Sequence, residues 1–419
     1  MDKKKRLRRD RLQNLLILAL SISAVYLFFL TGSLEMELPA LTLSSPSAEE
    51  TPLSSSLLQE LDWPVTLVIR DNSGERRYRQ LSTSESDFTS VEGLWEDLFR
   101  DGFHPLSIPY TKFESALSLP GIYVSFPSPI PLCILSERLG LPSTNETMIQ
   151  HLLLVAEDEA VSFYHSDGDL FFLSHTALKA SDLIATAGVI SGSRCSFAFE
   201  QKDSILHPLT VLPDDLPQYS QFSAVSAVQT ESADNLLTFF GFNAHTTSRY
   251  VDSSGTEVIV ESPRRLSITP GGHITYLGST SYAPEGFTLS EQPAPTLSEL
   301  VDGAYNLLTQ LCEDTDLRFY LSDAEYLHSD GTCTLRFSRM AEGLPLLSGD
   351  GEAAAELLIE DGIVVSFRFL QRSYFPSDTP SLLLPLRQAS AIAGRYEGME
   401  MALSYVDNGS TAAVSWLMR

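Results

Sequence analysis

A cluster of basic residues followed directly by an apolar run constrains this chain more than any other feature. Seven of the first eleven residues are lysine or arginine, and the apolar run covers residues 15–30, or 12–32 at its widest. About twenty apolar residues span a bilayer core, so we expect residues 12–32 to form one transmembrane helix behind a basic cytoplasmic tail, residues 1–11.

The end of this run distinguishes an anchor from a cleaved signal peptide. Residues 25–30 are mostly bulky, whereas signal peptidase requires small side chains, which favours an uncleaved anchor over a removed signal. Because the basic cluster precedes the run, we expect a single-pass protein of the cell membrane with a cytoplasmic N-terminus. Everything after Ser33 would then be extracytoplasmic.

The run also contains a candidate packing face. Ala19 and Ser23 are four residues apart, and small residues at this spacing let transmembrane helices approach closely. A helix that simply faces lipid is the alternative interpretation.

The charge balance limits the class of partner. The chain has 54 acidic and 28 basic residues, a formal net charge of -26. A surface of this sign repels nucleic acid and anionic lipid. The acidic residues do not follow the spacing of an EF-hand loop, so we expect a solvated acidic surface and no metal or other cofactor.

Cysteine usage excludes a disulfide-stapled scaffold. The four cysteines are too few for this length; they are Cys133, Cys195, Cys312 and Cys333. For the first two we expect buried thiols or a disulfide. Cys312 ends a predicted helix and Cys333 opens a predicted strand beside it, so this pair is a candidate disulfide, with two free thiols as the alternative.

Composition divides the part after the apolar run into four segments. Residues 33–58, rich in proline, serine and glutamate, have no apolar period and predict a stalk. A first α+β domain is expected at 59–210. A second domain at 211–288 starts with a helix near 231–240 and continues as four short strands. A third domain at 289–419 repeats that order.

The third domain contains the clearest helix. Thr296 and Glu299 form a capping-box pattern, and the apolar residues that follow share one face. Asp330-Gly331, Asp361-Gly362 and Asn408-Gly409 are turn sequences favoured in hairpins. The predicted fold class is therefore α+β: a transmembrane helix followed by extracytoplasmic domains in which helices pack on antiparallel β-meanders.

Catalytic motifs are absent from the sequence. The eight histidines are scattered without an H-E-x-x-H pattern, and neither G-x-S-x-G nor S-x-x-K occurs. The adjacent acids Glu157, Asp158 and Glu159 could in principle serve glycoside hydrolysis, but in such an acidic chain they are better explained as solvated surface. We therefore expect no enzyme activity and no catalytic residue.

Several stretches resemble a known family. They include Asn235-Leu236-Leu237-Thr238-Phe239-Phe240-Gly241-Phe242-Asn243, Ser254-Gly255-Thr256-Glu257-Val258-Ile259-Val260-Glu261 and Gly362-Ile363-Val364-Val365-Ser366-Phe367. They are similar to the YycH/YycI family of Gram-positive bacteria and, in the third domain, to the related PepSY-like domains. The resemblance covers the apolar run and about residues 225–419, and the matching motifs are structural rather than catalytic.

The resemblance implies a regulator. Members of the family are membrane-anchored partners of the WalK (YycG) sensor histidine kinase, which controls cell-wall metabolism, and YycH and YycI usually occur as a pair. The expected partners are thus a WalK-like kinase and a paired homologue. The alternative function is an extracytoplasmic module that binds a peptide or a wall fragment, as a PepSY-like inhibitor would.

Overall fold

The computed structural model describes most of the chain after residue 56. The described residues are 57–100, 104–141, 143–202, 204–226, 230–243, 245–279, 287, 289, 295–312, 318–349, 351–393 and 398–419.

The first sheet has nine strands in the order β3-β7-β6-β5-β4-β1-β2-β8-β9, and each neighbouring pair is antiparallel. The strands are β1 (Pro64–Arg70), β2 (Arg76–Ser82), β3 (Leu106–Ile108), β4 (Gly121–Pro131), β5 (Met148–Glu157), β6 (Ala160–Ser166), β7 (Phe171–Lys179), β8 (Ser193–Phe197) and β9 (Val211–Pro213). The helical elements in this part of the chain are η1 (Leu57–Gln59), α2 (Ser86–Arg100), α3 (Tyr110–Ala116), α4 (Leu132–Arg138), α5 (Ala180–Val189) and η2 (Ala198–Glu200).

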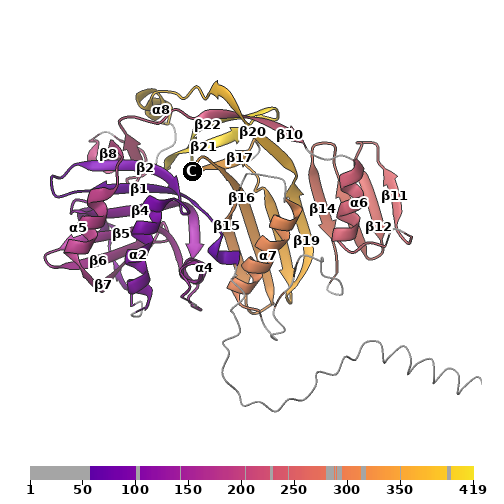
Figure 1. Cartoon of the computed structure of the whole chain (residues 1–419), viewed down its shortest axis with the longest axis horizontal. Helices are drawn as coiled ribbons and strands as arrows, with labels where there is room; N and C mark the ends of the chain where they lie inside the picture. The colour runs from indigo at the N-terminus through magenta and orange to yellow at the C-terminus, as the bar shows by residue number, and fades with distance from the viewer. Residues whose placement is uncertain are drawn as a thin grey trace, which may run out of the picture. The chain divides into compact units, whose positions relative to one another are not determined.

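Alternating apolar residues give the first sheet two packed faces. Leu67 and Ile69 of β1 lie in a core with α2, α4 and α5, whereas Val68 packs with Phe113 of α3 on the opposite face. Figure 1 shows α2 and α5 in front of the sheet. Successive residues of a strand point to opposite faces, so β1 supplies both cores.

The second sheet has thirteen strands in the order β11-β12-β13-β14-β19-β18-β16-β17-β21-β22-β10-β20, and β15 also pairs with β16. The strands are β10 (Ser220–Ser226), β11 (Ser248–Val251), β12 (Glu257–Glu261), β13 (Arg264–Ile268), β14 (His273–Leu277), β15 (Arg318–Leu327), β16 (Thr332–Ala341), β17 (Leu344–Ser348), β18 (Ala355–Glu360), β19 (Ile363–Leu370), β20 (Arg372–Pro380), β21 (Met401–Asp407) and β22 (Thr411–Met418). Its helices are α6 (Thr230–Phe239), α7 (Leu297–Leu311) and α8 (Leu386–Ala393).

Two amphipathic helices cover one face of the second sheet. Leu236 and Leu237 of α6 and the apolar stripe of α7 belong to the same core as the inward residues of β12 to β19. The predicted capping box of α7 is confirmed, because the Glu299 amide donates to Thr296 Oγ1 at 3.2 Å and the Thr296 amide donates to Glu299 Oε2 at 2.8 Å. The Asp361-Gly362 turn is also confirmed, with both residues at positive φ.

The predicted α+β class is wrong. The described part of the protein is mostly β, with 47% of its residues in strands and 22% in helices, arranged in two large sheets. Several strands contain residues that argue against a strand in sequence: β4 includes Pro127 and Pro129, β20 includes Pro376, and three of the seven residues of β2 are arginine. Proline cannot donate to a ladder, and strand pairing by neighbours overrides such weak local preferences.

The predicted localisation is also corrected. Within the described part of the chain, no helix combines the length and the apolar character needed to cross a bilayer. Residues 1–56 lie outside the described residues, and with them the predicted transmembrane segment 12–32, its packing face at Ala19 and Ser23, and most of the predicted stalk.

Residues Ser55–Arg419 form one compact unit. In it the predicted second and third domains share one sheet, since β14 pairs with β19 from Ile274↔Phe369 to Leu277↔Ser366. That residues 211 and 289 mark boundaries between separately folding units stays a prediction.

The two sheets meet closely at a glycine. Gly343 lies in the turn between β16 and β17, at φ +71°, and a Cβ added there would lie 3.0 Å from the Leu81 carbonyl carbon of β2. The Gln80 side-chain amide donates to the Gly343 carbonyl oxygen at 2.8 Å. A side chain at this position would therefore push backbone against backbone.

We expect Gly343→Ala to destabilise the protein by about 2–4 kcal/mol, because it combines strain at positive φ with a backbone clash. Gly351 is the matched control: its φ is +77°, but no atom lies within 4 Å of the position that a Cβ would take there. Gly351→Ala should cost only about 1 kcal/mol. Urea unfolding of both variants measures the difference, and equal losses would show that the sheets are not tightly apposed at Gly343.

Candidate binding site

The C-terminal hairpin borders two different sites. β21 and β22 are joined through the Asn408-Gly409 turn, which the sequence predicted. The other end is closed by Glu400 and Arg419, whose backbone groups bond reciprocally at 2.8 and 2.9 Å and whose side chains form an ion pair at 3.0 Å. Arg419 Nη1 also donates to the Pro127 carbonyl oxygen of β4 at 3.0 Å. The hairpin is thus attached to the first sheet.

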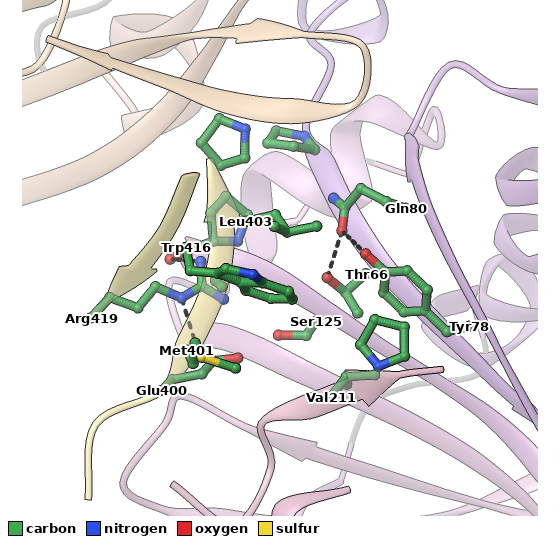
Figure 2. Close-up of a pocket in the computed structure, with 15 residues that line it drawn as sticks. Thr66, Tyr78, Gln80, Ser125, Val211, Glu400, Met401, Leu403, Trp416 and Arg419 are labelled. Atoms are coloured by element: carbon green, nitrogen blue, oxygen red, sulfur yellow. Dashed lines mark hydrogen bonds and ion pairs between the residues drawn. The ribbon is translucent and has the colours of Figure 1, made fainter. Parts of the chain in front are cut away.

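One side of the hairpin faces a small polar cavity against the first sheet (Figure 2). Thr66 Oγ1 donates to Gln80 Oε1 at 3.0 Å, and the Tyr78 hydroxyl donates to the same oxygen at 3.3 Å. The cavity volume is about 30 Å³, and one water molecule needs about 10–15 Å³ on this scale. The cavity therefore has room for little more than water.

A second site beside the hairpin is an apolar groove of about 440 Å³. Its lining comes from the 382–384 loop, α8 and the two strands of the hairpin: Leu382, Leu383, Leu384, Ala389, Ile392, Ala393, Met399, Met401, Val414, Ser415, Trp416, Leu417 and Met418. Serine is the one polar side chain among these. Leu382 is 90% exposed and Ile392 is 56% exposed, so apolar surface is left in contact with water.

Local chemistry explains why the groove forms here. Pro385 precedes α8, and its carbonyl oxygen accepts from the amides of Gln388 and Ala389 at the start of that helix. Trp416 of β22 donates its indole N–H to the Leu384 carbonyl oxygen at 2.9 Å. This bond holds the 382–384 loop, called the leucine loop below, across the hairpin. Trp416 lines both the groove and the small cavity (Figure 2).

A buried histidine of the first sheet and a half-buried histidine of the loop before β9 lie near the end of the hairpin. His151 of β5 is hydrogen-bonded through Nδ1 to the Tyr123 hydroxyl at 2.9 Å, and burial lowers the pKa of His151 to about 4. Burial also lowers the pKa of His207. At Glu400, burial acts to raise the pKa, but the Arg419 guanidinium and the neighbouring histidines outweigh it, and the net pKa is lowered. Burial keeps His151 neutral at neutral pH; the Arg419 guanidinium also lowers the pKa of His151, whereas the Glu400 carboxylate acts to raise it.

Free thiols are one of the alternatives that the sequence leaves open for the cysteines. Cys133, Cys195 and Cys333 are free thiols, and burial raises the pKa of Cys333 to about 12 and that of Cys133 to about 11. Thiols with such pKa values are protonated at neutral pH and weakly nucleophilic. Cys312 caps the C-terminus of α7; Cys333 has a free thiol in this structure, and its pairing with Cys312 under oxidising conditions stays a prediction.

The adjacent acids have structural roles. Glu157 accepts hydrogen bonds from Ser162 Oγ at 2.6 Å and from the Tyr164 hydroxyl at 2.9 Å. Asp158, at φ 56°, forms the turn between β5 and β6. In the described part of the chain, no three side chains of histidine, cysteine, aspartate or glutamate are grouped so as to hold a metal ion.

Sequence reasoning missed the groove. One signal was present, the run Ser381-Leu382-Leu383-Leu384 between Pro380 and Pro385. Such a run is too short for a core helix and is bounded by breakers, which is typical of an apolar loop. Its partners, Ile392 and Trp416, are separated from it in sequence, so the groove itself exists only after folding.

Comparisons with known proteins show no family. No family model matches the chain, and no curated protein matches it. Among solved structures, the chain is similar to an uncharacterized protein from Eubacterium rectale, with 10% sequence identity and a TM-score of 0.32. The match covers 48% of this chain and 76% of that protein.

The buried histidines predict a loss of stability in acid. Because the pKa of His151 is about 4 in the folded state and 6.5 when the side chain is not buried, the unfolded chain takes up a proton that the folded chain does not, and stability falls as pH drops from about 6.5 towards 4. Each pKa unit corresponds to about 1.36 kcal/mol, so His151 accounts for on the order of 3 kcal/mol. His151→Gln should therefore lose clearly less stability than the wild type between pH 7.5 and 4.5 in urea unfolding.

The control for this experiment is His175→Gln, since His175 is an exposed residue of β7. It should follow the wild-type pH dependence. If His151→Gln does so too, His151 is protonated in the folded protein and its burial does not control the acid response.

Proposed function

We propose that this chain is a non-catalytic regulatory protein that binds a partner protein through the apolar groove beside the C-terminal hairpin. The observation that carries the proposal is the groove itself. Its volume is about 440 Å³, its lining side chains are apolar except for one serine, and several of them are exposed to water. Exposed apolar surface gathered in a concave site is typical of recognition sites.

The lining favours an apolar polypeptide segment as the occupant. Three of the chain's seven methionines, Met399, Met401 and Met418, line the groove. Methionine is flexible and polarizable, and it is common at surfaces that accept apolar peptide faces. An amphipathic helix placed in a groove buries residues spaced three and four apart. We therefore propose that the partner inserts the apolar face of one helix.

The resemblance to the YycH/YycI family suggests the partner. It implies a sensor histidine kinase of the two-component type that governs cell-wall metabolism, with a paired homologue of this chain as a second partner. The resemblance is carried by residues 235–243 and 362–367, which lie in α6 with the turn after it and in β19. The groove would supply the contact surface for the regulation.

Capture of a free peptide is the second candidate, and the same groove favours it. A wall fragment fits less well, because sugar hydroxyls need hydrogen-bonding partners and the lining offers one hydroxyl side chain. Nucleic acid is disfavoured by the net charge of -26. A competition experiment distinguishes the two candidate occupants. If a segment of the kinase occupies the groove, an added apolar peptide should compete with the kinase; if the groove captures free peptides, it should not.

The groove can be tested with two charge substitutions, Leu382→Asp and Ile392→Asp. Both side chains are exposed, so the fold should tolerate them, while a buried carboxylate in the complex would be unpaired. Each variant should bind the purified sensor histidine kinase at least tenfold more weakly, a loss of about 1.4 kcal/mol or more, in a titration by light scattering or calorimetry.

The matched control is Val189→Asp, because Val189 is 79% exposed at the end of α5 and is not among the groove residues. It should bind the kinase as the wild type does. Kinase binding unchanged in both groove variants would contradict docking at the groove. If the wild type binds no kinase but binds apolar helical peptides, and both groove variants lose that binding, peptide capture replaces regulation.

A further inference from the structure

The two sheets end in strands of different character. At the ends of the first sheet, β3 and β9 have three residues each, and β9 includes Pro213. At one end of the second sheet, β20 includes Pro376 and Pro380. Short strands and prolines are devices that prevent another chain from pairing with an edge. The fourth end, β11, has four residues and no proline. The edge strand β15, which pairs with β16 outside this order, packs against β4 of the first sheet.

The register of β11 directs backbone groups away from the protein. β11 pairs with β12 alone, from Ser248↔Val260 to Val251↔Glu257. Just beyond, the Asp252 amide donates to the Thr256 carbonyl oxygen at 2.9 Å. Antiparallel pairs alternate between bonded and non-bonded positions, so the N–H and C=O groups of Arg249 and Val251 point to the open side. These outward groups are two residues apart, which is the spacing of donors and acceptors that an incoming antiparallel strand needs in order to pair with β11.

The side chains of β11 indicate what kind of strand would fit. Tyr250 is 52% exposed and Val251 is 66% exposed, and neighbouring residues of a strand lie on opposite faces. An incoming strand would therefore gain apolar contact on both of its faces, through cross-strand pairs with Tyr250 and Val251.

The charges around β11 indicate which charge an incoming strand should carry. Arg249 bonds to Asp234 at 2.8 Å and forms a second ion pair with Glu257, so its charge is already neutralised. The carboxylate of Asp252 follows at the end of the strand, and Arg265 lies two strands away on β13. Carboxylates remain in excess locally, as they do over the whole chain at -26. A second acidic copy of this chain would be repelled, whereas a basic strand would be attracted.

We propose that β11 is a strand-addition site for an extended segment of a partner protein that carries both apolar and basic side chains. Main-chain hydrogen bonds to Arg249 and Val251 give the affinity, and the side chains on the two faces give the specificity. The site involves no residue of the apolar groove, so it can be present or absent independently of the function proposed above.

The probe is a capped, fluorescein-labelled peptide of alternating valine and lysine, titrated against the full chain. Its matched control is the same peptide N-methylated at alternate residues, which keeps the side chains but removes the donors that would pair with β11. We expect the first peptide to bind at least tenfold more tightly than the second and to weaken with added salt. We also expect it to slow hydrogen exchange of the Arg249 and Val251 amides.

A variant of the chain tests the same contact from the other side. Val251→Pro removes an outward-pointing N–H, which the ladder with β12 does not use, and should weaken peptide binding at least tenfold. Val251→Thr keeps the N–H and a β-branched side chain, and should weaken it less than threefold. Thermal unfolding shows whether each variant is folded, and the comparison of the two peptides on the wild-type chain does not depend on either variant.

Three results would overturn the proposal. One is equal binding of the two peptides, which would show that side chains alone are recognised. Another is the absence of protection at Arg249 and Val251 when the peptide is bound. The third is a dimer of the chain, seen by light scattering and abolished by Val251→Pro, which would assign the edge to a second copy.

Discussion

The carboxylate of Asp62 is the buried charge around which the two sheets are joined. It is 1% exposed and accepts hydrogen bonds from Thr83 Oγ1 at 2.6 Å and from the Ser84 amide at 3.0 Å. Arg318 of β15 reaches it from the second sheet at 3.0 Å. A buried carboxylate without partners would cost several kcal/mol, so these donors must be in place together. The neighbouring Trp63 adds an indole bond to the Leu321 carbonyl oxygen at 3.2 Å.

This junction explains why the C-terminal hairpin lies against the first sheet. With β15 held at Asp62 and Gly343 pressed against Leu81, the strands that follow in the second sheet come to lie beside β1, β2 and β4, and Arg419 bonds to β4. Where the hairpin meets the polar residues of the first sheet, only a small cavity is left. Where α8 and the leucine loop cover the hairpin in part, the groove is left.

Local features of the sequence predicted local structure well and the architecture poorly. The Thr296 cap and the Asp361-Gly362 turn depend on residues a few positions apart, so the sequence was sufficient for them. The class was wrong because β4 and β20 are strands despite their prolines, and what makes them strands is pairing with β5 and β10. The groove was missed for the same reason, since Leu384 and Trp416 meet only through a bond that spans thirty-two positions of sequence.

Some of the few basic residues lie inside the protein rather than on its surface. Arg339 is 3% exposed, where it donates to the Leu370 carbonyl oxygen at 2.9 Å and lies over the rings of Phe319 and Phe369. Arg264 likewise donates to carbonyl oxygens after α6, including that of Phe240 at 3.1 Å. Arg264 also forms an ion pair with Glu261, whereas Arg339 neutralises no surface carboxylate among the ion pairs that the structure describes. The surplus of carboxylates therefore stays in water, where it attracts basic partners from a distance, while the uncharged groove provides the apolar contact that holds a partner once it has arrived.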